Sequence, residues 1–378
     1  MRFPEFTEEW QEHKLCNIAS IVGRIGFRGY TTNDIVAKGK GAIALSPTNI
    51  ENNRLTYDKD NTYISFYKYE ESPEIMIKQG DVVFVKTGST VGKVAYVDKL
   101  MCKTTLNPQV IVLKNIQCDN YLLSVLMSTS RFQNAIRKIT VGGAVPTLSQ
   151  AAMGDIAVTM PQVAEQEKLS KFISLLDKRI ATQNKIIEDL KKLKSAISLK
   201  MLHSDSWEQF KIQDIASIGR GRVISSVEIS QQENPLYPVY SSQTSNDGIM
   251  GYLDDFMFEG EYISWTTDGA NAGTVFYRNG KFNCTNVCGL LKLKKGFDAH
   301  FVSLVLAEAT RMYVSTNLAN PKLMNNTMGN IQIRLPKLEE QKRISVVFRK
   351  LHGLLETHNS LIIKYSKQKQ YLLSQMFI

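Results

Sequence analysis

Two short stretches of the chain have residue types that could do chemistry, and the first could bind phosphate. In Gly88-Ser-Thr-Val-Gly92-Lys93, glycines precede a lysine, as in loops whose backbone N–H groups cradle a phosphate. Such a loop needs four residues between its glycines and a Ser or Thr after its lysine. Here three residues separate the glycines and Val94 follows the lysine, while the matching stretch of the second half ends in Gly273-Thr274. The pattern therefore predicts a hairpin turn and not a nucleotide site.

The second stretch, Asn107-Pro-Gln-Val, resembles the Asn-Pro-Pro-aromatic motif of amino-methyltransferases. It lacks the second proline and the aromatic residue, its repeat partner is Val287-Cys-Gly, and no glycine-rich cofactor loop accompanies it. The sequence also has no Gly-x-Ser-x-Gly elbow and no Pro-Asp…(Asp/Glu)-x-Lys nuclease pattern. Its five histidines and five cysteines are dispersed, without a Cys-x-x-Cys pair. We predict no catalytic residue, no metal site and no disulfide framework.

The composition is that of a folded soluble protein that prefers polyanions. A length of 378 residues is too large for one ordinary core, so two or three domains are expected. The net charge of +10 favours a polyanionic partner, with nucleic acid as the first candidate. The acidic N-terminal stretch and the lack of a long apolar run argue against a signal peptide and a membrane span. We expect a cytoplasmic protein.

Polar and basic residues that could contact nucleic acid lie on turns beside the predicted hairpins. Arginine can fork onto guanine, Asn and Gln onto adenine, and Ser or Thr can serve bases or phosphates. Most residues of these types in any protein are ordinary solvated side chains, so only some of the candidates are expected to make contacts. The candidates of the first half are Arg24, Arg28, Tyr30, Lys86, Thr87, Ser89 and Lys93, and those of the second half are Arg220, Arg222, Ser241, Gln243, Thr266, Thr267, Asn271 and Arg278.

These candidates belong to two versions of one unit, because the chain repeats itself. Residues 153–203 recur from residue 328 to the C-terminus at a constant offset of 175. The opening elements around Trp10 and Trp207 match at an offset of 197. The first half therefore holds about twenty extra residues, and we expect most of them in the Gly-, Lys- and Asn-rich stretch 22–62.

The middle of each half is rich in strand signals, with β-branched and aromatic residues in short runs bounded by turn residues. Apolar residues at helical spacing follow these runs. Each half is therefore predicted to be a mixed α/β globule. The expected strands are 80–85, 93–97 and 110–114 in the first half and 260–265, 274–277 and 290–294 in the second, with helices at 120–138 and 299–316.

After Pro161 and Pro336, each half closes with a long charged segment whose apolar residues alternate by four and three positions. That spacing is the a/d pattern of a coiled coil. Each helix could pack on its own domain, but two stripes of equal length in one chain favour pairing with each other. The stripe residues are Ile173, Leu176, Ile180, Ile187, Leu190 and Ile197 in the first helix and Phe348, Leu351, Leu355, Ile362, Tyr365 and Leu372 in the second, with Lys194 and Lys369 at matching a positions.

The sequence thus predicts an α+β protein with four segments. Two mixed α/β domains are joined by two long helices that form an antiparallel coiled coil, and a pseudo-two-fold axis relates the repeats. The first domain is expected at 1–160 and the first long helix at 161–204. The second domain is expected at 205–335 and the second long helix at 336–378.

Four short motifs in a fixed order carry a resemblance to a known family. They are Arg2-Phe-Pro-Glu-Phe…Trp10, Gly80-Asp-Val-Val-Phe…Thr87-Gly-Ser, Val145-Pro-Thr-Leu-Ser…Pro161…Glu165-Gln-Glu-Lys-Leu and Pro321-Lys-Leu…Pro336…Glu340-Gln-Lys-Arg-Ile. They resemble the opening, the recognition-domain signature and, twice, the start of the spacer helix in specificity subunits of type I restriction–modification enzymes. Each motif alone is moderately specific. Their order, their duplication and the long helices together are strongly specific for this family.

The resemblance implies that the two domains are target recognition domains for double-stranded DNA, each reading one half of a bipartite site. It implies that the helices set the unread spacer and dock two methyltransferase subunits, and that two motor–nuclease subunits complete the enzyme. S-adenosylmethionine, ATP and Mg²⁺ would then belong to those partners, and this chain would hold no cofactor. Because the two halves differ in their turns, we expect an asymmetric site.

Two alternatives come from other classes of protein. An autonomous DNA-modifying enzyme would need a cofactor site, and none is recognisable in the sequence. A coiled-coil scaffold without a DNA role would show no salt-dependent binding to duplex DNA.

Overall fold

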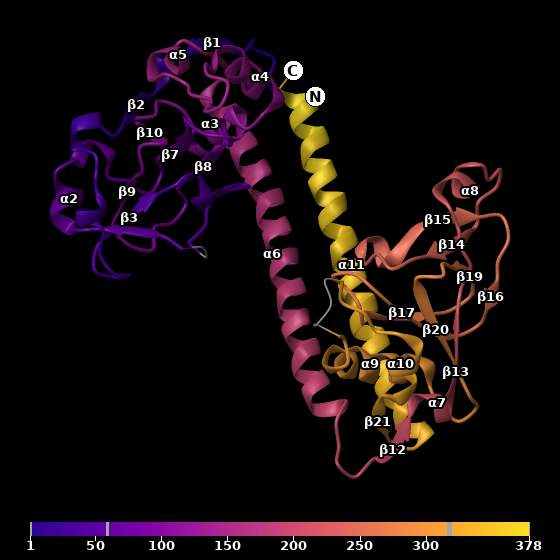
Figure 1. The fold of residues 1–378 in the computed structure, drawn as a ribbon. Coiled ribbons are helices and arrows are strands. Elements are labelled where there is room, and N and C mark those ends of the chain that lie inside the picture. Colours follow the sequence, from indigo (N-terminus) through magenta and orange to yellow (C-terminus); the bar gives the residue numbers. More distant parts are fainter. Residues whose placement is uncertain (1, 58–59, 316–319, 378) are drawn as a thin grey trace. The chain divides into compact units, whose positions relative to one another are not determined.

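The computed structural model describes residues 2–57, 60–315 and 320–377. The chain divides into two compact units (Figure 1). Unit 1 comprises residues 1–183 together with 361–378, and unit 2 comprises residues 184–360. Each unit therefore contains one globular part and a portion of each long helix.

Unit 1 contains a two-stranded sheet, a six-stranded central sheet and a smaller three-stranded sheet. Its first strand pairs with its last, β1 (Gln11–Lys14) with β11 (Ala157–Met160). The central sheet has the order β2 (Ser20–Gly23), β10 (Val110–Lys114), β7 (Val82–Val85), β8 (Val94–Tyr96), β5 (Asn53–Leu55), β4 (Ile50–Glu51). The smaller sheet has the order β6 (Thr62–Ile64), β3 (Ala42–Leu45), β9 (Thr104–Leu106). The helices are α1 (Leu15–Ile18), α2 (Phe66–Glu70), α3 (Asn120–Met127), α4 (Ser130–Ile139) and α5 (Gln150–Gly154), with 3₁₀ turns at Gly26–Arg28, Thr32–Asp34, Pro47–Asn49 and Pro73–Ile75.

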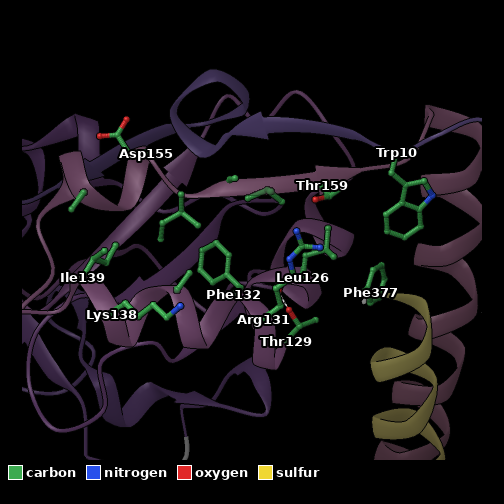
Figure 2. A pocket seen from close by; sticks show the side chains of 15 residues that line it. Trp10, Leu126, Thr129, Arg131, Phe132, Lys138, Ile139, Asp155, Thr159 and Phe377 are labelled. Atoms are coloured by element: carbon green, nitrogen blue, oxygen red, sulfur yellow. Dashed lines mark hydrogen bonds between the residues drawn. The ribbon is translucent and has the colours of Figure 1, made fainter.

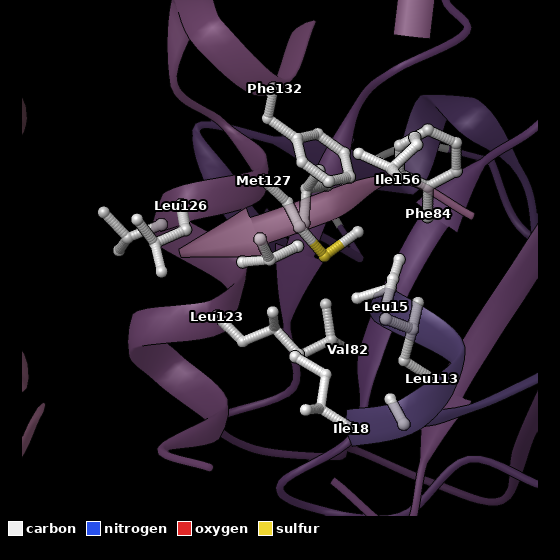
Figure 3. Packing of buried hydrophobic residues seen from close by; sticks show 14 of the residues in the cluster. Leu15, Ile18, Val82, Phe84, Leu113, Leu123, Leu126, Met127, Phe132 and Ile156 are labelled. Atoms are coloured by element: carbon white, nitrogen blue, oxygen red, sulfur yellow. The ribbon is translucent and has the colours of Figure 1, made fainter. Parts of the chain in front are cut away.

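The middle of the central sheet in unit 1 is covered on both faces, which explains why its strands β7 and β10 are almost continuously apolar. Successive side chains of a strand point to opposite faces. In β7, Val82 and Phe84 pack with Leu123 of α3 on one face (Figure 3). Val83 and Val85 pack on the other face, against a cluster that includes residues of the smaller sheet.

Unit 2 has the same plan. Its opening strand β12 (Glu208–Lys211) pairs with its closing strand β21 (Gln332–Leu335). The central sheet is β13 (Ala216–Arg220), β20 (Cys288–Leu293), β17 (Tyr262–Thr266), β18 (Val275–Arg278), and the smaller sheet is β15 (Ile249–Leu253), β14 (Tyr237–Tyr240), β19 (Lys281–Cys284), β16 (Phe258–Glu259). The helices are α7 (Ile212–Ile215), α8 (Ser226–Ser230), α9 (Ala299–Ala309) and α10 (Asn325–Asn330), with 3₁₀ turns at Ser245–Gly248 and Thr310–Met312.

The predicted strands are present in both units with small shifts of their ends, and the internal repeat is confirmed. The helix expected at 120–138 is two helices, α3 and α4, because the chain turns at Ser128-Thr129 between them. The helix expected at 299–316 is α9 followed by a 3₁₀ turn, and its predicted end, Thr316, lies outside the described residues.

The extra residues of the first half are more dispersed than predicted. The offset between matching strands is 187 for β6 and β15 and 180 for β7 and β17. Only about half of the extra residues therefore fall in 22–62, where they form the β4–β5 hairpin. Much of the rest lies between β6 and β7, where unit 1 contains α2.

The two long helices are α6 (Val163–Met201) and α11 (Leu338–Met376), and each has 39 residues. In unit 1, the first part of α6 contacts the last part of α11, since Asp177 bonds to Lys369 at 2.5 Å and Arg179 lies over the ring of Tyr365. In unit 2, Ile197 near the end of α6 packs on the cluster that contains Phe348 near the start of α11. The helices therefore run antiparallel, as predicted.

The alternative that each helix packs on its own domain also holds for the first part of each helix. Ile173 belongs to the core of unit 1 and Phe348 to the core of unit 2, so these two stripe residues serve the globular parts. The other stripe residues are buried or half-buried along the helices, while most residues between them are exposed.

The repeated glutamine after each proline fastens a helix to its domain. Gln166 accepts the Asp119 N–H at 2.9 Å and donates to the Pro161 carbonyl at 2.8 Å. Gln341 makes the same two bonds, to Asp298 at 3.0 Å and to Pro336 at 2.8 Å. Both aspartates cap the helix that follows them.

Candidate nucleic-acid interface

Four chain segments meet at one edge of the central sheet in unit 1. Neighbouring strands are antiparallel, and the register places Gly23 opposite Ile111 and Val85 opposite Val110. The end of β2, the start of β10, the end of β7 and the start of β8 therefore share this edge. We call its loops, residues 24–30, 86–93, 107–109 and 140–147, the loop edge of unit 1.

The hairpin turn 86–93 is held rigidly within this loop edge. Gly88 N–H donates to the Pro146 carbonyl at 2.9 Å, and Leu148 N–H donates to the Lys86 carbonyl at 2.8 Å. Gln133 donates to the Gly92 carbonyl at 2.8 Å. Gly88 and Gly92 have φ values of 104° and 97°, which favour glycine. The glycines therefore shape a turn, in agreement with the hairpin prediction.

Four candidates of unit 1 lie on this turn. Ser89 and Lys93 are exposed, whereas Lys86 and Thr87 are half-buried. The ammonium groups of Lys86 and Lys93 form no ion pair with any described residue. Both positive charges are thus available to a partner from outside.

The prediction that Arg24 contacts nucleic acid is corrected, because its side chain is buried and bonds within the protein. Its side chain is 8% exposed and donates to the Leu106 carbonyl at 2.9 Å and to the Thr105 hydroxyl at 3.1 Å. Burial lowers the pKa of its guanidinium. Arg28 is half-buried and is held by the Glu71 carbonyl at 3.3 Å. Arg24 therefore supports the strand that leads into loop 107–109 and does not face a ligand.

Loop 107–109 lies beside the turn. The Asn107 side chain accepts the Gln109 N–H at 2.9 Å and donates to the Tyr30 hydroxyl at 3.0 Å. The Gln109 carbonyl accepts the Lys86 N–H at 2.9 Å. Asn107 is thus a turn-forming residue. The hydroxyl of Tyr30 is the hydrogen-bond acceptor for the Asn107 side chain.

Unit 2 has an equivalent loop edge, formed by the end of β13, the turn 267–274, loop 285–287 and residues 320–323. Gly269 N–H donates to the Pro321 carbonyl at 3.0 Å, and Leu323 N–H donates to the Thr267 carbonyl at 2.8 Å. Arg220 lies opposite Gly289 at this edge. The register also shows that the partner of Asn107-Pro-Gln is Thr285-Asn-Val287, two residues before the stretch predicted from the sequence.

Three candidates of unit 2 are buried and are therefore corrected as well. Thr266 and Thr267 are at most 2% exposed, and the Thr267 hydroxyl donates to the Val287 carbonyl at 2.8 Å. Arg278 is 5% exposed, donates to the Ser264 hydroxyl at 2.9 Å and stacks on Tyr240 at 3.6 Å. Burial lowers the pKa of the Arg278 guanidinium. It connects the two sheets of the unit, so it cannot face a ligand.

The remaining candidates of unit 2 lie on the surface. Asn271 and Arg222 are exposed, but Arg222 is paired with Glu228. Arg220 is half-buried and donates to the Asn325 side chain at 2.9 Å. Ser241 and Gln243 follow β14, whose last carbonyl accepts the Thr285 N–H at 2.9 Å, so they adjoin loop 285–287.

Sequence reasoning missed four residues at the two loop edges. Gln109 and Asn286 lie in the loops before β10 and β20, and Asn325 and Lys322 lie beside Arg220 and the turn. The sequence carries a signal for Gln109, because this residue belongs to the Asn107-Pro-Gln-Val motif.

An apolar cavity in unit 1 is separate from the loop edge (Figure 2). Its volume is about 420 Å³, and Trp10, Leu126, Phe132 and Phe377 are among its lining residues. Its charged residues are Arg131, Lys138 and Asp155, and Asp155 is paired with Lys14 at 2.8 Å. Across residues 2–57, 60–315 and 320–377, no group of three His, Cys, Asp or Glu side chains could hold a metal ion. In the same ranges no helix is long and apolar enough to cross a membrane.

Comparisons with known proteins all identify the same protein family. The family model of the type I restriction modification DNA specificity domain matches residues 7–192 and 204–364. A Mycoplasma pneumoniae protein named as a type I specificity subunit is 35% identical over 233 residues, which cover 60% of this chain and 97% of that protein. The specificity subunit of a type I restriction enzyme from the same organism is 41% identical over 177 residues, covering 45% of this chain and 53% of that subunit.

Solved structures show the same fold. The S subunit of a type I restriction–modification system from M. genitalium superposes with a TM-score of 0.71 at 14% identity, covering 100% of this chain and 97% of that chain. A chain from another type I system superposes with a TM-score of 0.54 at 13% identity, covering 98% of both chains. At these identities the likeness concerns the fold alone.

Proposed function

This chain belongs to the type I restriction–modification DNA specificity family, with two specificity domains, and we propose that it is the DNA-reading subunit of such an enzyme. The two target recognition domains are residues 1–160 and 205–335, and the long helices 161–204 and 336–378 connect them. Each domain reads one half of a bipartite site in double-stranded DNA through its loop edge. The subunit works in the cytoplasm.

One observation carries the assignment of the loop edges. Both units present the same four segments at the same edge of the central sheet, although their loops share little sequence. Each edge also presents cations without a carboxylate partner among the described residues. They are Lys86 and Lys93 in unit 1 and Arg220 and Lys322 in unit 2. Rigid loops with unneutralised cations suit a phosphate backbone.

The two half-sites differ in sequence. Unit 1 has the β4–β5 hairpin beside β8, and no strand in the described part of unit 2 matches it. The turns also differ, since Lys93 of unit 1 is replaced by Thr274 in unit 2. Different side chains at equivalent positions select different bases, so the bipartite target is asymmetric.

Partner subunits supply the chemistry. The half-buried stripes of α6 and α11 leave the outer faces of both helices free to dock two methyltransferase subunits, and two motor–nuclease subunits complete the enzyme. S-adenosylmethionine, ATP and Mg²⁺ are bound by those partners, and this chain contributes recognition without catalysis.

Base-resolution mapping of methylated sites in cells with and without this chain tests the proposal. We expect a bipartite, non-palindromic motif that disappears when the chain is deleted. Exchanging residues 22–140 for those of a relative should then change one half-site only. A palindromic motif would contradict the asymmetry. A lack of salt-dependent binding to duplex DNA by the assembled complex would favour the scaffold alternative.

A further inference from the structure

Each loop edge contains a short loop that joins the smaller sheet to the central sheet. In unit 1 it is loop 107–109, between β9 and β10, and in unit 2 it is loop 285–287, between β19 and β20. Besides Asn107, whose amide bonds to Tyr30, the two loops carry one amide side chain each, Gln109 or Asn286. Gln109 is half-buried and Asn286 is exposed.

Both loops are held by hydrogen bonds to their neighbours, so the backbone that carries each amide is fixed. The Gln109 backbone is held on both sides, by the Asn107 side chain and by the Lys86 N–H. The Asn286 carbonyl accepts from Arg220 at 3.4 Å, and the next carbonyl, that of Val287, accepts from the Thr267 hydroxyl at 2.8 Å. A group that reads a base must be held near its productive position by such supports.

The amide groups themselves make no hydrogen bond with any described residue. The Gln109 Nε2 atom lies 3.4 Å from the point where a Cβ on Gly88 would stand, so the absence of a side chain at Gly88 leaves room for the amide. Other amides at these edges are committed: Asn107 bonds to Tyr30, and Asn325 bonds to Arg220. Gln109 and Asn286 thus combine a fixed backbone with an unused donor and acceptor.

We propose that Gln109 and Asn286 are base-reading residues, one for each half-site, and that each reads an adenine. This inference rests on the proposed function. In the major groove adenine presents one acceptor, N7, beside one donor, the N6 amino group, and a carboxamide matches this pair with its own donor and acceptor. Guanine presents two acceptors and would leave the amide oxygen unpaired.

The surroundings support a base contact over a phosphate contact. Phosphates are bound mainly by cationic side chains. At each loop edge the cations belong to residues other than the two amides, namely Lys86 and Lys93 in unit 1 and Arg220 in unit 2. The register further shows that Asn286 is equivalent to Pro108 and Val287 to Gln109, so the amides occupy adjacent positions in the two repeats. The two adenines should therefore hold different places within their half-sites.

The test uses the complete complex with its methyltransferase subunits and a library of duplexes that varies every base of the bipartite site. Gln109→Ala should reduce the preference for adenine at one position of one half-site by roughly tenfold to a hundredfold, with the other half-site unchanged. Asn286→Ala should do the same at one position of the other half-site. Gln109→Glu, which is isosteric, should shift the preference at its position toward cytosine, because a carboxylate accepts from the cytosine amino group.

Two matched amides serve as controls at the opposite end of the same sheets. Gln117 follows β10, Asn279 follows β18, and both are exposed. Gln117→Ala and Asn279→Ala should retain the parental preference at every position. An unchanged preference in all three test variants, or a loss of affinity equal for all sequences, would overturn the inference and leave the proposed function intact. If the parental complex shows no bipartite preference, the proposed function itself fails.

Discussion

Gln166 and Gln341 show how single residues connect reading domain and long helix. Each side chain is nearly inaccessible and bridges the carbonyl of the proline before the helix to the N–H of a helix-capping aspartate. In unit 1 the neighbouring Glu165 is fully buried and bonds to Arg2 at 2.6 Å and to the Trp10 indole at 3.2 Å. In unit 2 the matching Glu340 is exposed. The glutamine is therefore the shared device, and the glutamate is particular to unit 1.

Removing either glutamine should destabilise its unit. Gln166→Ala or Gln341→Ala leaves a partly buried N–H and a buried carbonyl unpaired, which costs about 1–3 kcal/mol of unfolding free energy. Hydrogen exchange at the amides of α3 or α9 measures the loss in each unit separately. Gln117→Ala, at an exposed site, should change neither. Equal exchange rates in the buried-site variants and the parent would contradict the bridging role.

His300 gives unit 2 a pH dependence. Its ring is half-buried, bonds to the Ser345 hydroxyl at 2.8 Å and has a pKa lowered to about 4, first by burial and then by the nearby Arg349. Because the folded pKa lies below the ordinary value of 6.5, the unfolded chain binds more protons between these two values. The unfolding free energy should therefore fall as the pH is lowered from about 6.5 to about 4.

The variant His300→Gln isolates this effect, because it retains a hydrogen-bonding group without titrating. We expect the melting temperature of the parent to decrease more than that of the variant between pH 7 and pH 5. Carboxylates elsewhere act equally in both proteins. Parallel melting curves across this range would show that His300 does not titrate differently on folding.

At the level of elements, a charged residue in the heptad stripe of α11 is paired with a residue of α6. Lys369 occupies an a position, and its ammonium group bonds to Asp177 of α6 at 2.5 Å. The Tyr121 hydroxyl of α3 donates to the other oxygen of Asp177 at 2.6 Å, and burial raises the pKa of that tyrosine. The three groups join the two helices and the globular part within unit 1.

Removing one partner of this cluster should lower the unfolding free energy more than replacing both charged partners with apolar residues. Asp177→Ala leaves the Lys369 charge and the Tyr121 hydroxyl without their partner, and because the pair is partly exposed we expect a loss of about 1–3 kcal/mol, below the range for fully buried pairs. The double variant Asp177→Leu with Lys369→Leu should recover part of that loss, as apolar replacements of ion pairs often do. Chemical unfolding followed by circular dichroism measures both. A double variant less stable than the single one would refute this account.

At the level of the whole molecule, the equal lengths of α6 and α11 suit helices that measure the spacer between half-sites. Inserting one matched heptad in both helices should lengthen the unread spacer of the methylation motif and preserve both half-sites, since each insertion adds about 10 Å of helix. A heptad in one helix alone shifts the stripes out of register and should disrupt assembly with the methyltransferase subunits. Methylome mapping reads out the first result and gel filtration of the complex the second. An unchanged spacer after matched insertion would exclude the measuring role.

The sequence by itself determined the repeat, the two long helices with heptad stripes and most strand positions, whereas the contacts of Asp177 with Lys369 show that the helices are antiparallel. These features depend on local periodicity: a/d spacing in the helices and β-branched runs in the strands. A heptad stripe has to be covered wherever the helix lies, so its residues can be named before the fold is known. The same reasoning found the rigid hairpin turns at Gly88 and Gly269.

Only the tertiary structure decided which polar residues face outward. The buried Arg24 donates to the Leu106 carbonyl, 82 residues away in the chain, and the buried Arg278 donates to the Asp247 carbonyl, 31 residues away. No local sequence pattern therefore distinguishes these two arginines from exposed ones. No local pattern marks Asn286 either, because the neighbours of its loop are brought together by strand pairing. Burial of a long side chain depends on what packs over it, and that is fixed by contacts between segments distant in the chain.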